Sequence, residues 1–85
     1  MPLYEALYPV GTTVRIADRD TLVQFRASWR YHHPLSDEQI EYANEPATVL
    51  KVGFYHGGDV LYELDRAPGT WHEQLLTAGT GARAV

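Results

Sequence analysis

Apolar and polar residues alternate along three consecutive runs in the second half of the chain. These runs cover residues 47–55, 60–65 and 70–76, and the turn-forming pairs Gly57-Gly58 and Pro68-Gly69 separate them. Successive side chains of a strand point to opposite faces, and a short link that contains glycine lets neighbouring strands pair antiparallel. The pattern therefore predicts a three-stranded antiparallel meander in a mostly β protein.

The alternation also predicts which side of the first of these strands faces the core. The expected core face consists of Thr48, Leu50, Val52 and Phe54. Both faces of the predicted strands carry large apolar side chains, which is typical of a sheet that bends and closes on itself or that meets a partner. Gly53, in the middle of the strand, favours such a bend.

The first half of the chain is expected to contain one short strand and a long insertion. The strand covers residues 12–16 and the insertion covers residues 17–46, which is too long for a segment without structure of its own. Within it, Ser36 and Gln39 have the spacing of a capping box, and acidic residues between them suit a helix N-terminus. We expect one short helix there, from Asp37 to about Ala43.

The predicted domain organisation has three parts. Residues 1–9 form an N-terminal arm, residues 10–78 form the folded domain, and residues 79–85 form a flexible tail. The spacing in the arm predicts a short helical turn that places four apolar or aromatic side chains on one face: Leu3, Tyr4, Leu7 and Tyr8.

Length and composition limit the class of protein. Eighty-five residues make one domain, and 45% hydrophobic with 21% charged residues is the balance of an ordinary folded protein. No apolar stretch is long enough to span a bilayer, and the N-terminus lacks the features of a secretory signal. The chain has no cysteine, which fits a reducing compartment. We expect a cytoplasmic protein.

The order of the predicted elements resembles that of the SH3-like small β-barrel superfamily. A short strand, a long first loop and a meander that ends in a strand with a tryptophan carry this resemblance, over about residues 10–78. Two families are similar in short segments. Residues 11–16, 49–52, 62–64 and 71–75 resemble the barrel domain of nitrile hydratase beta subunits. Residues 31–34, Tyr-His-His-Pro, resemble the variable chain of ferredoxin-thioredoxin reductase.

The resemblance implies an SH3-like small barrel whose long first loop carries one short α-helix. It also implies an accessory role, because in neither family does the barrel itself carry the metal centre or the redox cysteines. An accessory subunit of a nitrile hydratase-like enzyme is therefore one candidate function. Fold alone does not determine function, so this expectation is an analogy.

Four histidines are the candidate metal ligands: His32, His33, His56 and His72. Imidazole suits zinc, copper or nickel, and a nearby carboxylate could complete a site. Adjacent histidines on an extended segment point in opposite directions, however, and no pair has the spacing of a helical ligand pair. We expect turn or surface histidines and no metal site or other cofactor.

No pattern in the chain indicates an enzyme. Ser28 near His32 and His33 is the one neighbourhood of serine with histidine, and the acidic residues have no spacing that suggests a triad. Asp59 follows Gly57 and Gly58, and an aspartate is common in such a turn because its side chain bonds neighbouring backbone amides. We therefore expect no catalytic residues.

The charge distribution suggests two arrangements. The net charge is −4, which disfavours general binding to phosphate backbones. Residues 19–33 hold three arginines against one acid, whereas residues 37–45 hold four acids and no base. The two segments are expected to lie against each other or to be solvated; alternatively they form a bipolar surface.

Nucleic-acid binding stays open as an alternative function. The residues that would carry it are Phe25, Arg26, Trp29 and Arg30.

The preferred function is a non-catalytic protein-interaction or accessory module. The chain has ten aromatic residues, more than one small core holds comfortably, so part of this set is expected on the surface, although Trp71 and Phe54 are also core candidates. A protein partner or a second copy of the chain is expected, without a membrane. The candidate binding residues are four aromatics and two acids: Trp29, Tyr31, Tyr55, Trp71, Asp37 and Glu41.

Overall fold

The computed structural model describes residues 6–29, 31–55 and 59–79. In chain order the elements are β1 (Thr13–Ile16), α1 (Arg19–Ser28), α2 (Asp37–Ile40), β2 (Pro46–Tyr55), β3 (Asp59–Leu64), β4 (Trp71–His72), the 3-10 helix η2 (Glu73–Leu75) and β5 (Leu76–Ala78). Within these described ranges, no helix is long and apolar enough to cross a membrane.

One antiparallel sheet of five strands organises the molecule. Its strand order is β4-β3-β2-β1-β5, with β4 and β5 at the two edges, so the sheet is open. The predicted mostly β class is confirmed, and β2, β3 and β4 form the predicted meander. The third strand is shorter than expected, because η2 interrupts it after two residues and the chain continues as β5 beside β1.

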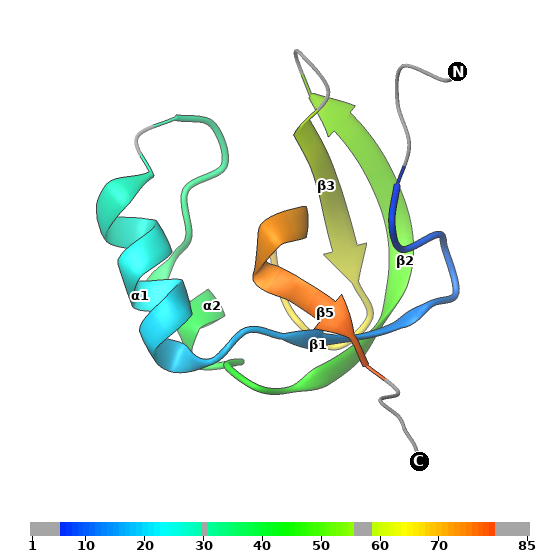
Figure 1. Ribbon diagram of the computed structural model, residues 1–85, viewed down its shortest axis with the longest axis horizontal. Helices are drawn as coiled ribbons and strands as arrows, with labels where there is room; N and C mark the ends of the chain where they lie inside the picture. The colour runs from blue at the N-terminus through cyan, green and yellow to red at the C-terminus, as the bar shows by residue number, and fades with distance from the viewer. Residues whose placement is uncertain (1–5, 30, 56–58, 80–85) are drawn as a thin grey trace.

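The long strand β2 belongs to both halves of the sheet. Its first residues, Pro46 to Thr48, pair with β1, and its remaining length pairs with β3. The register shifts between Val49 and Lys51, where β2 carries one extra residue. Such a bulge bends a strand and increases its twist. In Figure 1, β1 and β5 accordingly run across the direction of β2 and β3, and the core lies between the two halves.

The predicted core face of β2 is wrong at Leu50 and Phe54, although Val52 packs against the core. Ala47 and Val49 are buried, whereas Leu50 is 58% exposed and Phe54 is 43% exposed. The extra residue at the bulge puts the alternation of side chains out of phase on its two sides, so no single set of alternate positions can face the core along the whole strand. Beyond the bulge, Val52 lies opposite the buried Tyr62 but is only half-buried itself.

The core combines residues of all the strands with both helices. Its largest fully buried side chains are Trp71, Tyr62, Ile16, Leu22, Leu75, Val14 and Val49. The hydroxyl of Tyr62 donates a hydrogen bond of 2.5 Å to the carboxylate of Glu73. Burial, together with this hydrogen bond, raises the pKa of Tyr62. The arm closes this side of the core, since the ring of Tyr8 lies 5.7 Å from that of Tyr62.

The arm differs from its prediction in the part that is described. Residues 6–9 form bends and not a helical turn, and Leu7 is 68% exposed while Tyr8 is half-buried. The backbone N–H of Leu7 donates to Glu73, which places the arm along η2. Leu3 and Tyr4, like the tail beyond residue 79, lie outside the described residues.

The insertion contains two helices, and only the second was predicted. Helix α1 begins after Asp18, whose side chain accepts a hydrogen bond of 3.0 Å from the N–H of Thr21. This bond satisfies one of the free amides of the first turn, and the hydrogen bonds from Thr21 lower the pKa of Asp18. Leu22 and Phe25, three residues apart, turn one face of α1 into the core.

Helix α2 confirms the predicted capping box. The Ser36 hydroxyl accepts from the N–H of Gln39, and the Gln39 side chain accepts from the N–H of Ser36. The helix ends at Ile40 rather than at Ala43, because the next four residues form a turn. That turn closes at Asn44, whose φ of 69° is left-handed and whose N–H donates to the carbonyls of Ile16 and Ala17.

Candidate functional site

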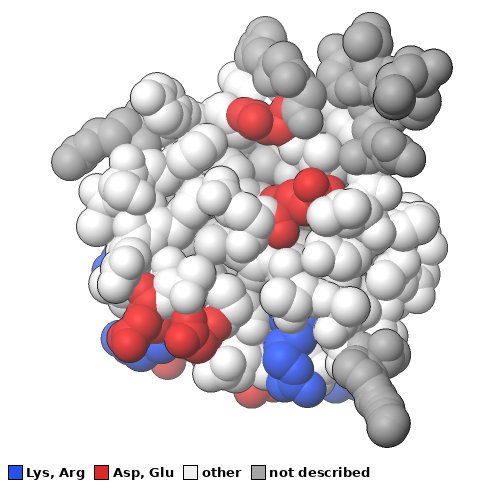
Figure 2. Space-filling view, in the orientation of Figure 1, with Lys and Arg blue, Asp and Glu red and all other residues white. Residues whose placement is uncertain are grey.

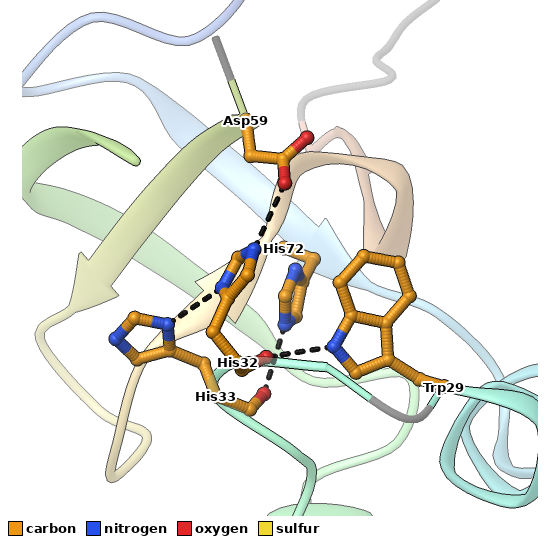
Figure 3. Close-up of polar contacts among 5 residues, drawn as sticks. All are labelled: Trp29, His32, His33, Asp59 and His72. Atoms are coloured by element: carbon orange, nitrogen blue, oxygen red, sulfur yellow. Dashed lines mark hydrogen bonds and ion pairs between the residues drawn. The ribbon is translucent and has the colours of Figure 1, made fainter. Parts of the chain in front are cut away.

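The loop between α1 and α2 folds over the outer face of the β2–β3–β4 meander. Residues paired across antiparallel strands share a face, so Tyr55, Asp59, Leu61 and His72 lie together on the side opposite Trp71 and Tyr62. The loop adds Trp29, His32 and His33 to this face, through contacts shown in Figure 3. We call six of these residues the outer cluster: Trp29, His32, His33, Tyr55, Asp59 and His72.

A chain of hydrogen bonds links a carboxylate to two imidazoles in this cluster. His32 Nε2 lies 2.8 Å from Asp59 Oδ2, and His32 Nδ1 lies 2.8 Å from His33 Nδ1 (Figure 3). The expectation that the adjacent histidines point in opposite directions is therefore wrong. His33 has a left-handed φ of 52°, and this kink turns its ring toward that of His32.

The protonation pattern of this chain follows from donor and acceptor roles. An ionised Asp59 only accepts, so His32 carries its proton on Nε2. In a neutral His32 ring, Nδ1 then accepts from the Nδ1–H of His33; in an imidazolium it donates to His33 instead. The direction of the hydrogen bond between His32 and His33 thus depends on whether the His32 ring carries one proton or two.

His72 anchors the loop from the strand side. Its side chain is only 3% exposed, and its Nε2 lies 2.8 Å from the carbonyl oxygen of His33. A carbonyl only accepts, so Nε2 carries the proton of the neutral ring. Burial lowers the pKa of His72. The ring also packs against Phe25 and Trp29, at centroid distances of 4.9 and 4.8 Å.

Aromatic rings connect the cluster to the surface. Trp29 stacks on Phe25 at 5.0 Å, meets Tyr31 edge to face at 5.1 Å, and donates its indole N–H to the carbonyl of His32 at 2.7 Å. On the other side, the ring of Tyr55 lies 4.0 Å from that of His32. Tyr31 is 72% exposed and Tyr55 is 36% exposed, so a continuous band of rings reaches solvent at both ends.

The structure brings together three of the predicted protein-binding residues, Trp29, Tyr31 and Tyr55, and separates the rest. Trp71 is fully buried in the core and cannot touch a partner, because it points to the opposite side of β4 from His72. Asp37 and Glu41 are exposed on and beside α2, and Asp37 forms an ion pair with Arg26.

Among the described residues of the nucleic-acid alternative, Phe25 and Arg26 are not open to contact bases. Phe25 is buried beneath Trp29, and the guanidinium of Arg26 forms an ion pair with Asp37. This pair joins the basic and the acidic segment at one point, and the Asp37 side chain in it is 97% exposed. Arg30 lies outside the described residues, as does His56.

The part of the chain that the structure describes contains no group of three or more His, Cys, Asp or Glu residues that could hold a metal ion. In the outer cluster, His32 uses one nitrogen for Asp59 and the other for His33, so its ring has no nitrogen left for a metal. These histidines are instead hydrogen-bonding groups between the loop and the sheet.

A hollow of about 190 Å³ continues the outer face along β2 and β3. It is lined by Gly53, Leu61, Tyr62, His33 and Thr70 and by the charged residues Lys51 and Glu63. A Cβ atom at Gly53 would meet nothing within 4 Å, so the missing side chain leaves this space open. The hollow has room for a small apolar side chain beside the band of rings.

The pairing of His32 with Asp59 and the burial of His72 were not predicted. Asp59 was explained by its turn and the histidines were expected at the surface, yet these groups meet across 27 and 39 positions of the chain. No local pattern indicates contacts at such separations. The register that pairs Leu61 with His72 on one face is visible only in the structure.

Comparison of this chain with protein-family models, with curated proteins and with solved structures found no match.

Proposed function

We propose that this protein is a non-catalytic interaction module that binds a protein partner through the outer cluster and the rings beside it. The observation that carries the proposal is the continuous band formed by Tyr31, Trp29, His32 and Tyr55, exposed at both ends and adjoining the hollow over Gly53. Rigid aromatic side chains beside a small apolar hollow suit an extended segment of a partner, and they are typical anchors of protein interfaces.

A non-catalytic role is favoured by the surroundings of the hydrogen-bonded chain. Asp59, His32 and His33 would need a nucleophile within reach to act in group transfer. The hydroxyl of Ser28 instead donates to the carbonyls of Gln24 and Phe25 in its own helix. Protein binding is also favoured over nucleic-acid binding, because the net charge is −4 and Arg26 is engaged by Asp37.

An SH3-like small barrel is the fold class that we propose for this module. The bend at the β2 bulge and the position of β1 between β2 and β5 support this class, while the two free edges of the sheet leave the barrel open. An accessory chain in a larger cytoplasmic assembly, as the resemblance to nitrile hydratase beta subunits implies, would use the same surface.

Site-specific photo-crosslinking from inside the native host tests this function. A photoreactive phenylalanine analogue replaces Tyr31, and a matched variant carries it at Leu50, which is also an exposed apolar position but lies at the β2 bulge. We expect one protein partner to be crosslinked from position 31, to persist after nuclease treatment, and to be absent from position 50. Crosslinked nucleic acid, or the same products from both positions, would contradict the proposal.

A further inference from the structure

A second hollow borders the outer cluster on the side of η2. It measures about 210 Å³ and lies between the end of α1, the start of β3 and η2, with a lining of Trp29, Asp59, Val60, His72, Glu73 and Gln74. Figure 2 shows acidic atoms in the upper and central part of this face, without basic atoms beside them. The lining of this hollow has two carboxylates and no lysine or arginine, whereas the neighbouring hollow over Gly53 is lined by one carboxylate, Glu63, and by Lys51.

Both carboxylates keep hydrogen-bonding capacity for a ligand. Asp59 uses Oδ2 for His32, and Glu73 uses Oε2 for the hydroxyl of Tyr62 and the N–H of Leu7. Among the described residues, no donor contacts the second oxygen of either group, and no lysine or arginine lies within ion-pair distance of them. The pair is thus held in place by neutral donors and one imidazole while its other oxygens stay available.

His72 adds a third acceptor group to the lining of this hollow. Its Nε2–H is used by the carbonyl of His33, so Nδ1 is the unprotonated nitrogen of the neutral ring. Figure 3 shows this second nitrogen on the side of the ring away from that carbonyl, and no described residue hydrogen-bonds it. The indole N–H of Trp29 is also occupied, by His32, so Trp29 contributes only its ring.

Three acceptor groups line this small hollow, the carboxylates of Asp59 and Glu73 and the imidazole of His72, and they select the chemistry of the ligand. A ligand that fills this space has to bring several donors and a positive charge, because the wall offers two carboxylates and an imidazole nitrogen. A guanidinium carries five N–H donors in a flat fork and is less strongly hydrated than an ammonium. It fits an arrangement of this kind better than a single point charge.

We propose that the hollow between α1, β3 and η2 binds the guanidinium group of an arginine side chain on the protein partner. The inference rests on the proposed function and names one chemical feature of the partner: an arginine placed next to the segment that lies on the band of rings. Asp59 then belongs to both parts of the site, since it holds His32 with one oxygen and faces the arginine with the other.

The two tryptophans provide the test, by nuclear magnetic resonance on the intact chain. The probe is Nα-acetyl-arginine-N-methylamide, and the control is the corresponding citrulline compound, which has nearly the same shape but no charge, at matched ionic strength. We expect the arginine probe to shift the indole resonance of Trp29 saturably and to leave that of the buried Trp71 unchanged. The citrulline control is expected to shift neither resonance.

Variants connect any shift to the hollow. Glu73→Gln keeps the shape of the side chain and is expected to weaken binding of the probe about tenfold, the loss of one charge-assisted hydrogen bond. The matched control is Glu45→Gln, which removes an exposed carboxylate just before β2, outside both hollows, and is expected to leave binding unchanged. If Glu73→Gln fails to give a dispersed spectrum, Asp59→Asn serves in its place.

Two results would overturn the inference. One is equal binding of the arginine and citrulline compounds, and the other is binding that Glu73→Gln, or Asp59→Asn in its place, leaves unchanged. The proposed function fails differently, through the loss of crosslinking from position 31. A crosslinked protein partner together with an inert arginine probe therefore refutes only the guanidinium site.

Discussion

Trp71 and His72 are neighbours on β4, and they stabilise two different layers of the molecule. Both side chains are buried, with 0% and 3% of their surface exposed, but they point to opposite sides of the strand. Trp71 lies among apolar side chains between the two halves of the sheet. His72 lies under the loop that follows α1, among imidazoles, aromatic rings and a carboxylate.

The two layers depend on different interactions. The inner layer excludes water by apolar packing, and even the indole N–H of Trp71 is buried without a hydrogen-bond partner. The outer layer is held by three contacts of the loop, made by Trp29, His32 and His72, two of which involve titratable rings. The inner layer therefore sets the stability of the fold, whereas the outer layer can respond to pH and to a partner.

The largest expected effect separates the two layers by their tryptophans. Trp71→Ala leaves a cavity in the core and is expected to lower the free energy of unfolding by about 3–5 kcal/mol. Trp29→Ala, at a half-buried position, is expected to cost about 1–2 kcal/mol. Urea unfolding followed by circular dichroism measures both, and equal losses would contradict the distinction between the layers.

Two glycines give a second comparison. A Cβ atom at Gly79 would lie 2.6 Å from the backbone of Val14, so Gly79→Ala forces β5 and β1 apart and is expected to cost about 1–3 kcal/mol. A Cβ at Gly53 meets nothing within 4 Å, so Gly53→Ala on the outer face is expected to leave stability nearly unchanged. Thermal unfolding of the two variants decides between them; a large loss for Gly53→Ala would show that the outer face is closely packed there.

The outer layer is expected to respond to acid through His72. Burial lowers the pKa of His72 in the folded protein below the value of 6.5 for a free imidazole. At a pH between the folded and the unfolded pKa of His72, the unfolded chain binds more protons than the folded chain. The contribution of His72 to stability is therefore complete above about pH 6.5 and is lost as the pH falls toward the folded pKa. Charges on His32 and His33 would strengthen the loss, while Asp59 opposes it.

His72→Gln provides the control for this pH dependence. The amide can still donate to the carbonyl of His33 but does not titrate between about pH 8 and pH 5. We expect the free energy of unfolding to fall less steeply with acid in this variant than in the original protein. Identical slopes would show that another group controls the acid response.

The smallest expected effect concerns the pair of His32 and Asp59. Asp59 is half-exposed, so Asp59→Asn is expected to reduce the free energy of unfolding by less than about 1 kcal/mol. Its effect should be local: amide hydrogen exchange is expected to speed up in residues 31–35 and to stay unchanged in β1. Faster exchange throughout the sheet would show that the outer cluster supports the whole fold.

Local patterns predicted the meander, and they predicted α2 because the Ser36 and Gln39 side chains cap it within four residues. Helix α1 was missed although its signals were present: Asp18 at the N-cap and apolar residues at Leu22, Phe25 and Trp29. The polar residues between them weaken the apolar periodicity, and the helix gains its stability from packing Leu22 and Phe25 into the core.

The sequence by itself determined the class of the protein, since alternation and turn residues act between neighbours in the chain. Only the tertiary structure decided which faces are buried and which polar groups meet. One extra residue at the β2 bulge put the side chains before the bulge out of phase with those after it, and the left-handed backbone of His33 turned its ring toward His32. The candidate site depends on both kinds of event, because its contacts join residues 27 to 39 positions apart, whose proximity is set by the packing of the whole chain.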